Sequence, residues 1–98
     1  GIFAVRTHGL SDQPLEGVAS LGVRPTVEDA GRVLLEVHCF DWPAALGKEG
    51  GYGKIVRVEL LHKLRDEARY DGLEALQAAI HQDIADARGF FEAQRRGT

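Results

Sequence analysis

Hydrophobic and polar positions alternate along residues 33–40, in the middle of the chain. With the period of two that a strand imposes, one face is apolar throughout: Val33, Leu35, Val37 and Cys39. The opposite face carries Leu34, Glu36, His38 and Phe40. We expect the first face to lie on a hydrophobic core, with Cys39 as a small core residue.

Glu36 is the unusual residue of this run. Burying a carboxylate in an apolar strand is costly unless it is paired or functional, so Glu36 is the first candidate for chemistry. The alternative is a glutamate on the solvated side of an antiparallel sheet, which alternation alone favours.

Similar patterns predict three more strands, at residues 2–6, 17–24 and 54–62. The second contains Gly17, Ser20 and Gly22, which indicate a bulge, a bend, or the close approach of another backbone or a ligand. The apolar period then changes to three and four residues, which predicts a helix over 72–96. Its apolar stripe consists of Leu73, Leu76, Ile80, Ile84, Ala87 and Phe91.

Two connections stand out between these elements. The loop 41–53 contains Gly47, Gly50, Gly51 and Gly53, and loops longer than about 12 residues are usually functional or disordered. Trp42 is expected to anchor this loop, the alternative being a place beside a ligand. A charged connector, residues 63–70, leads to the helix.

The order of elements predicts a single, mainly β domain over residues 1–98, an antiparallel sheet or barrel with a helix packed against it. A formal charge of −3 argues against nucleic-acid binding, and no apolar run approaches the roughly 20 residues of a membrane span. The single cysteine excludes an intrachain disulfide and fits a cytoplasmic setting. Because the chain starts on a strand pattern without Met, we expect a fragment of a longer protein.

Two apparent motifs fail or stay weak. Gly53 and Lys54 resemble the end of a Walker phosphate loop, but Lys48 stands where its first glycine is required. A metal site built from Glu36, His38 and His62 would be possible if their strands were adjacent, but no metal site is predicted in this chain.

Five blocks in order resemble the riboflavin kinase module, usually the C-terminal part of bacterial bifunctional riboflavin kinase/FAD synthetase. They are GVASLGVRPT at 17–26, LEVHCFD at 35–41, YGK at 52–54, LRDE at 64–67 and YDGLE at 70–74. The resemblance covers nearly the whole chain. It implies a six-stranded antiparallel Greek-key barrel with a long C-terminal helix.

The resemblance also implies an activity, the phosphorylation of riboflavin to FMN with ATP and Mg²⁺. The glutamate matched by Glu36 is the general base of the family, and a carboxylate on a rigid strand suits that role. Arg65 and Glu67 match a block near the flavin, the alternative being a salt-bridged turn. Tyr52 and Gly53 match a flap beside the nucleotide, although the loop here is longer than usual.

One family motif, the Pro-Thr-Ala-Asn block that holds Mg²⁺ and the ATP phosphates, is not in this chain. Pro25 and Thr26 do not replace it, because Val27 and Glu28 follow them. The resemblance therefore implies that the fragment is inactive alone, and that the parent chain also carries an adenylyltransferase domain. The rival interpretations are a non-catalytic flavin- or nucleotide-binding barrel and a purely structural β-barrel domain.

Overall fold

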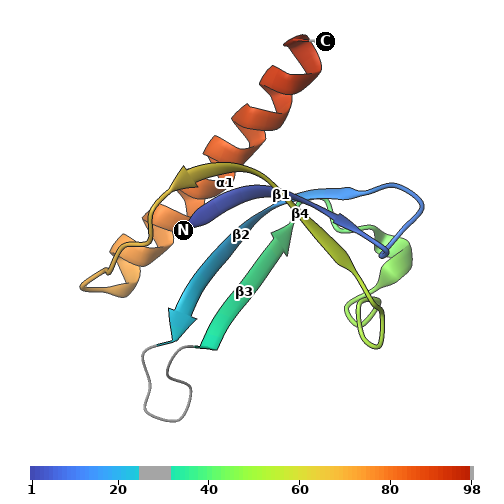
Figure 1. The fold of residues 1–98 in the computed structure, drawn as a ribbon, viewed down its shortest axis with the longest axis horizontal. Coiled ribbons are helices and arrows are strands. Elements are labelled where there is room, and N and C mark those ends of the chain that lie inside the picture. The colour runs from blue at the N-terminus through green and yellow to red at the C-terminus, as the bar shows by residue number, and fades with distance from the viewer. Residues whose placement is uncertain (25–31, 98) are drawn as a thin grey trace.

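The computed structural model describes residues 1–24 and 32–97, without the side chains of residues 23, 24 and 32. It contains strands β1 (Ile2–His8), β2 (Leu15–Arg24), β3 (Arg32–Cys39) and β4 (Arg57–Arg65), the short 3-10 helix η1 (Ala44–Leu46) and the long helix α1 (Leu73–Gly97) (Figure 1). The expected connection between the second and third strands, including Pro25 and Thr26, lies outside the described residues.

The strands form one antiparallel sheet in the order β3-β2-β1-β4. This is the Greek-key order, in which the fourth strand returns over a long connection to lie beside the first. The predicted closure into a barrel is not found in the part of the chain that the structure describes. Closure requires the two edge strands to pair, and here β3 and β4 are separated by β2 and β1.

The fourth strand begins and ends three residues later in the sequence than the predicted range 54–62. β4 exists only where it pairs with β1, from the His8–Arg57 pair to the Ile2–Arg65 pair. Residues 54–56 precede this ladder and are not in a strand. Two register shifts along the ladder interrupt the alternation on which the predicted bounds depended.

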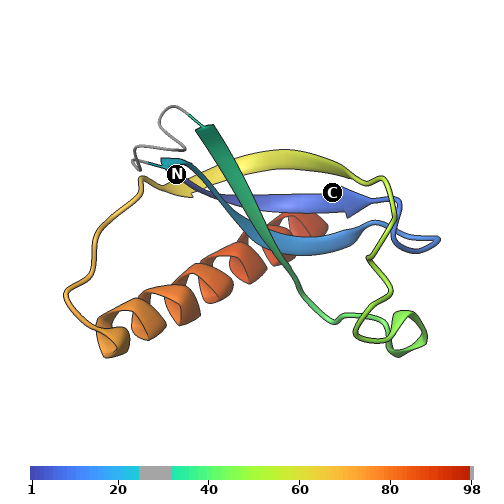
Figure 2. The same ribbon diagram turned by 90° about the horizontal axis from the view of Figure 1, so that it is seen from below.

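Helix α1 crosses one face of the sheet (Figure 2). Its C-terminal half is packed there, with Ala87 and Phe91 buried against the sheet residues Ile2, Ala4, Val18 and Phe40. The predicted stripe is correct in that half only, because Leu73, Leu76 and Ile80 are 68%, 40% and 45% exposed. None of the described helices combines the length and the apolar character that a membrane span requires.

The other face of the sheet is apolar and only partly buried. Val5 and Ala19 are buried there, but Val33 and Leu35 are 61% and 40% exposed. The prediction that the Val33–Cys39 face lies on a core is therefore wrong for Val33 and Leu35, whereas Val37 and Cys39 are partly buried. The helix packs on the opposite face, the one that carries Glu36, His38 and the buried Phe40.

Candidate functional site

A cavity of about 670 Å³ lies between the helix-facing side of the sheet, the connector before α1 and the first half of α1. The partly exposed Leu76 and Ile80 form its helical wall, and Ala68, Arg69 and Tyr70 contribute from the connector. Two of the three exposed residues of the apolar stripe therefore line a cavity. Such concave, mostly apolar spaces with a few convergent polar groups are typical of small-molecule sites.

One row of residues across the sheet forms the floor of this cavity. Glu36 pairs with Ser20, Ser20 pairs with Ile2, and Ile2 pairs with Arg65, and all of them line the cavity. Adjacent strands are about 4.8 Å apart, so the row spans about 14 Å from Glu36 to Arg65. The floor thus has a carboxylate at one end, an apolar centre and a guanidinium at the other end.

Glu36 projects into the cavity from β3. Its carboxylate has no hydrogen-bond or ion-pair partner among residues 1–24 and 32–97, and the side chain is exposed. Ser20, its cross-strand neighbour, offers a hydroxyl on the same face. A substrate hydroxyl between these groups could donate its proton to Glu36. A hydrogen bond with the Ser20 hydroxyl could hold the same substrate hydroxyl in place.

Arg65 ends β4 at the other end of the floor. Its Nε and Nη2 donate to the two carboxylate oxygens of Asp83, each at 2.7 Å, and its Nη1 donates to the carbonyl oxygen of Asp66 at 3.0 Å. The Asp83 hydrogen bond is the main reason that the pKa of Arg65 is raised above its usual value. The guanidinium centre also lies 5.8 Å from the centre of the Tyr70 ring.

Glu67 reaches the cavity from the connector and lies against Gly22 of β2. A Cβ at Gly22 would collide with the Glu67 carboxylate, so the absence of a side chain there makes room for it. At Gly17 a Cβ would collide with the backbone of β3 at His38. The close approach of another backbone, predicted from the glycines of this strand, is therefore confirmed at Gly17, whereas at Gly22 the neighbour is a side chain.

The predicted site residues fall into two groups. Glu36, Arg65 and Glu67 line the one cavity, although they come from β3, β4 and the connector. Tyr52 and Gly53 do not line it: they belong to the loop at the opposite end of the sheet, beside the β1–β2 turn (Figure 1). Tyr52 is 80% exposed, and Gly53 has a positive φ of 73°, which favours glycine.

Trp42 holds this loop together from within. Its indole N–H donates to the carbonyl oxygen of Gly47 at 2.7 Å, and Gly51 lies beside its ring and Leu10. Lys54 donates to the carbonyl oxygen of Leu10 at 3.3 Å, which ties the end of the loop to the β1–β2 turn. Trp42 is 39% exposed, so it braces the loop without being buried in the core.

The metal alternative fails on topology. His38 and His62 occupy β3 and β4, which are the opposite edges of the sheet and not neighbours. The His62 ring is instead stacked on Phe90 of α1, with centroids 5.1 Å apart. No group of three or more candidate ligands gathers in the described chain, so no step through a metal ion is derived from its residues.

Sequence reasoning missed Asp83 and gave Ser20 no role. Asp83 was detectable in principle, because it follows Leu76 and Ile80 at helical spacing and lies beside the apolar stripe, where a carboxylate requires a partner. Ser20 was noticed only as a small residue in a strand. Its position beside Glu36 depends on the register of β2 against β3.

Comparison with known proteins decides the family. The profile of the riboflavin kinase (flavokinase) family matches residues 1–91. The chain belongs to this family. The resemblance drawn from the five sequence blocks is thereby confirmed, and the cavity just described is that of a riboflavin kinase domain.

Several curated relatives are bifunctional riboflavin kinase/FMN adenylyltransferases. That of Escherichia coli strain K12 is 43% identical over 91 residues, which are 93% of this chain and 27% of that protein. That of Haemophilus influenzae is 36% identical over 93 residues, 95% of this chain and 28% of that protein. That of Pseudomonas fluorescens is 41% identical over 88 residues, which are 90% of this chain and 26% of that protein. The chain thus spans less than a third of the length of these relatives.

Proposed function

We propose that this chain is the riboflavin-binding part of a riboflavin kinase, which transfers the terminal phosphoryl group of ATP to the ribityl hydroxyl of riboflavin. The observation that carries the proposal is the cavity of a family member with Glu36 at one end of its floor. The apolar wall and the length of the cavity suit a flat ring system with a polar chain. The chain is proposed to act in the cytoplasm, within a bifunctional FAD synthetase.

Glu36 is the proposed general base. Phosphoryl transfer depends mainly on positioning and on neutralising charge, with a carboxylate to orient and deprotonate the attacking hydroxyl. Two features support this role: Glu36 is on a strand held by the β2 ladder, and its carboxylate has no competing partner among the described residues. Ser20 is available to hold the same hydroxyl.

Arg65 and Glu67 are the proposed flavin side of the site. Both line the cavity, Arg65 at the end of the floor away from Glu36 and Glu67 over Gly22 of β2; we propose that the flavin ring lies toward Arg65 and the ribityl chain toward β3. Tyr52 and Gly53 are proposed as part of a nucleotide flap. Since their loop lies outside the cavity, this role requires the loop to meet a nucleotide at the other end of the sheet or to move on binding.

Magnesium and ATP are the proposed co-substrate pair of the complete enzyme. Mg²⁺ would neutralise charge on the transferred phosphoryl group. We propose that its ligands, and the strands that close the six-stranded Greek-key barrel over the apolar sheet face, lie in other parts of the complete enzyme. The exposed Val33 and Leu35 and the two open sheet edges support this arrangement, as does the small share of the relatives that the chain spans.

The test is the riboflavin kinase activity of the complete enzyme that contains this chain, with FMN followed by chromatography. Glu36→Gln should lower kcat roughly 10²–10⁴-fold, the usual range for loss of a general base. Its Kd for riboflavin should change little. Glu74→Gln is the control, because Glu74 is an exposed carboxylate of α1 outside the cavity.

The rival interpretations are outcomes of the same experiment. An enzyme with near wild-type kcat after Glu36→Gln would remove Glu36 from the catalytic role. Riboflavin binding without turnover would identify a non-catalytic flavin-binding domain. A protein whose melting temperature responds to neither riboflavin, FMN nor ADP with Mg²⁺ would be a structural domain.

A further inference from the structure

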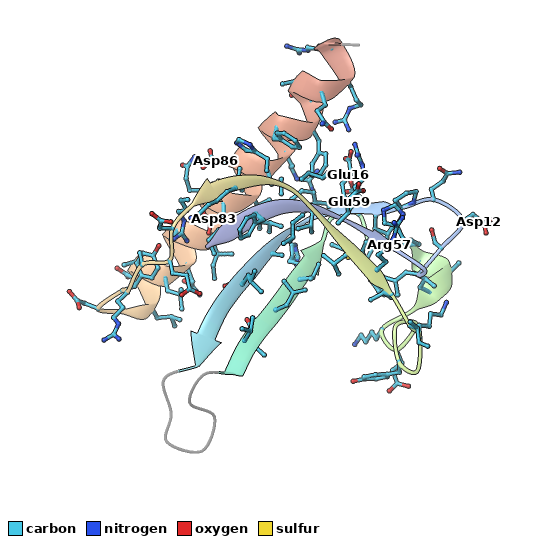
Figure 3. All side chains as sticks on the ribbon, in the orientation of Figure 1. Asp12, Glu16, Arg57, Glu59, Asp83 and Asp86 are labelled. Carbon is cyan, nitrogen blue, oxygen red and sulfur yellow. The ribbon has the colours of Figure 1, made fainter. Side chains whose placement is uncertain are left out.

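Asp83 is a buried carboxylate in the middle of α1. The residue is 5% exposed, although most of its neighbours along the helix are exposed. Figure 3 shows it where α1 passes beneath the end of β4, on the side of the helix that faces the sheet. A carboxylate at such a depth requires a cationic partner, and the partner is Arg65.

The contact between Asp83 and Arg65 uses both oxygens of the carboxylate. Nε and Nη2 of Arg65 each donate to one of them at 2.7 Å. Paired, parallel hydrogen bonds of this kind fix the plane of the guanidinium as well as its position. The carbonyl oxygen of Asp66 takes one N–H of Nη1 at 3.0 Å, so the guanidinium is held from two sides.

The guanidinium held in this way still has donors to offer. Each terminal nitrogen, Nη1 and Nη2, carries a second N–H that these bonds do not use. Arg65 lines the cavity. Because the plane of the guanidinium is fixed, its two remaining N–H donors have fixed directions, and they suit acceptor atoms of a flavin ring such as a ring nitrogen or a carbonyl oxygen.

We propose that Asp83 is a positioning residue for the ligand site: it holds the Arg65 guanidinium ready to bind before the flavin arrives. This inference rests on the proposed function. Asp83 does not touch the ligand and acts through Arg65. Without Asp83, the long Arg65 side chain would have to be ordered by the ligand itself, and the entropy lost in doing so would weaken binding.

The experiment measures the Kd of riboflavin by the quenching of its own fluorescence, in the complete enzyme. Asp83→Asn keeps the size of the side chain and should raise Kd roughly three- to ten-fold, the cost of ordering one long side chain on binding. The kcat should change less than KM, because Glu36 is at the other end of the floor. Glu16→Gln is the matched control: it weakens another sheet–helix ion pair, with Arg95 at 3.1 Å, away from the cavity.

A double-mutant cycle separates positioning from general stabilisation. If Asp83 acts through Arg65, Asp83→Asn should raise Kd in the wild-type background and have no further effect in the Arg65→Gln background. An equal effect in both backgrounds, or a Kd raised as much by Glu16→Gln, would overturn the proposal. So would an unchanged Kd after Asp83→Asn.

A measurement on the unmodified protein covers the case in which Asp83→Asn does not fold. The Nε–H resonance of Arg65 should be protected from solvent exchange both without ligand and at saturating riboflavin. Loss of that protection on binding would show that the ligand releases Arg65 from Asp83, and would overturn the proposal. A wild-type enzyme that binds no riboflavin at all would instead contradict the proposed function, and the inference with it.

Discussion

Gly17 and Gly22 show how two residues of one type in one strand can have different structural reasons. Added atoms at Gly17 would meet the backbone of β3 at His38, which the sheet holds in place. Added atoms at Gly22 would meet only the end of the flexible Glu67 side chain. The first glycine is therefore required by strand pairing and the second by the geometry of the site.

Alanine at these two positions should separate the two reasons. Gly17→Ala should lower the free energy of unfolding by about 1–3 kcal/mol, because backbone must move to admit the methyl group. Gly22→Ala should change it by no more than about 0.5 kcal/mol, since Glu67 can turn away. Urea denaturation of both variants tests this. Equal losses would show that Gly22 is also needed for packing.

At the scale of elements, α1 consists of two functionally different halves. The C-terminal half is a packing element, with Ala87 fully buried and Phe91 1% exposed. The N-terminal half leaves Leu76 and Ile80 at the wall of the cavity. One continuous apolar stripe thus stabilises the fold at one end and lines the cavity at the other.

Truncation along the helix should reveal this division. Phe91→Ala should cost about 3–5 kcal/mol, the usual loss for a fully buried phenylalanine. Leu76→Ala should cost about 1 kcal/mol, because a partly exposed side chain loses less buried area. Gln77→Ala, at an exposed position off the stripe, should stay within about 0.5 kcal/mol.

Denaturation midpoints measured at constant slope give these differences. A loss for Leu76→Ala as large as that for Phe91→Ala would mean that the first half of α1 is packed more tightly than its exposure indicates. In the complete enzyme, Leu76→Ala should raise the Kd of riboflavin, and this effect on binding should be larger than its effect on stability, because Leu76 lines the cavity.

The loop 41–53 is the other element with a testable internal support. Trp42→Phe keeps a ring beside Gly51 and removes the hydrogen bond to Gly47. A hydrogen bond of this kind contributes about 0.5–1.5 kcal/mol, so amide exchange within the loop should become roughly two- to ten-fold faster.

Global stability should change little, since the bond is local to the loop. Tyr52→Phe is the matched control, because Tyr52 is 80% exposed and its hydroxyl has no partner in the described part of the chain. Exchange rates unchanged by Trp42→Phe would show that other contacts, such as that of Lys54 with Leu10, hold the loop by themselves.

At the scale of the whole molecule, the described chain is one open layer of sheet with a helix on one side (Figure 2). Val33, Leu35 and Leu60 leave apolar surface exposed on the strands, which proteins normally cover. The edges β3 and β4 also present unpaired backbone groups. Both features favour further structure over this sheet in the complete enzyme.

We therefore expect the 98-residue chain alone to make FMN at least 10²-fold more slowly than the complete enzyme, because loss of even one charge-stabilising contact has about that effect. Weak riboflavin binding should survive, since Glu36, Arg65 and Glu67 are all within the chain. The two rates of FMN formation from riboflavin and ATP with Mg²⁺ are measured by chromatography and compared. Comparable rates would show that these 98 residues contain the whole catalytic site.

The sequence alone determined the main elements and the leading candidate for a site residue. A single helix and four strands follow from apolar period, which is a local property of the chain, and Glu36 was found because a carboxylate interrupts an apolar alternation. The family followed from short blocks in order, and the comparisons confirm it. These inferences need no knowledge of which strands are neighbours.

Only the tertiary structure decided which residues meet. Strand order brings Glu36, Ser20 and Arg65 into one row across the floor of the cavity and sends His38 and His62 to opposite edges. It also decides which sheet face the helix covers, so the helix packs on the face that carries Phe40 and the purely apolar face of residues 33–39 is only partly buried. Alternation distinguishes two faces but cannot say which one faces a partner, because burial depends on contacts between residues far apart in the chain.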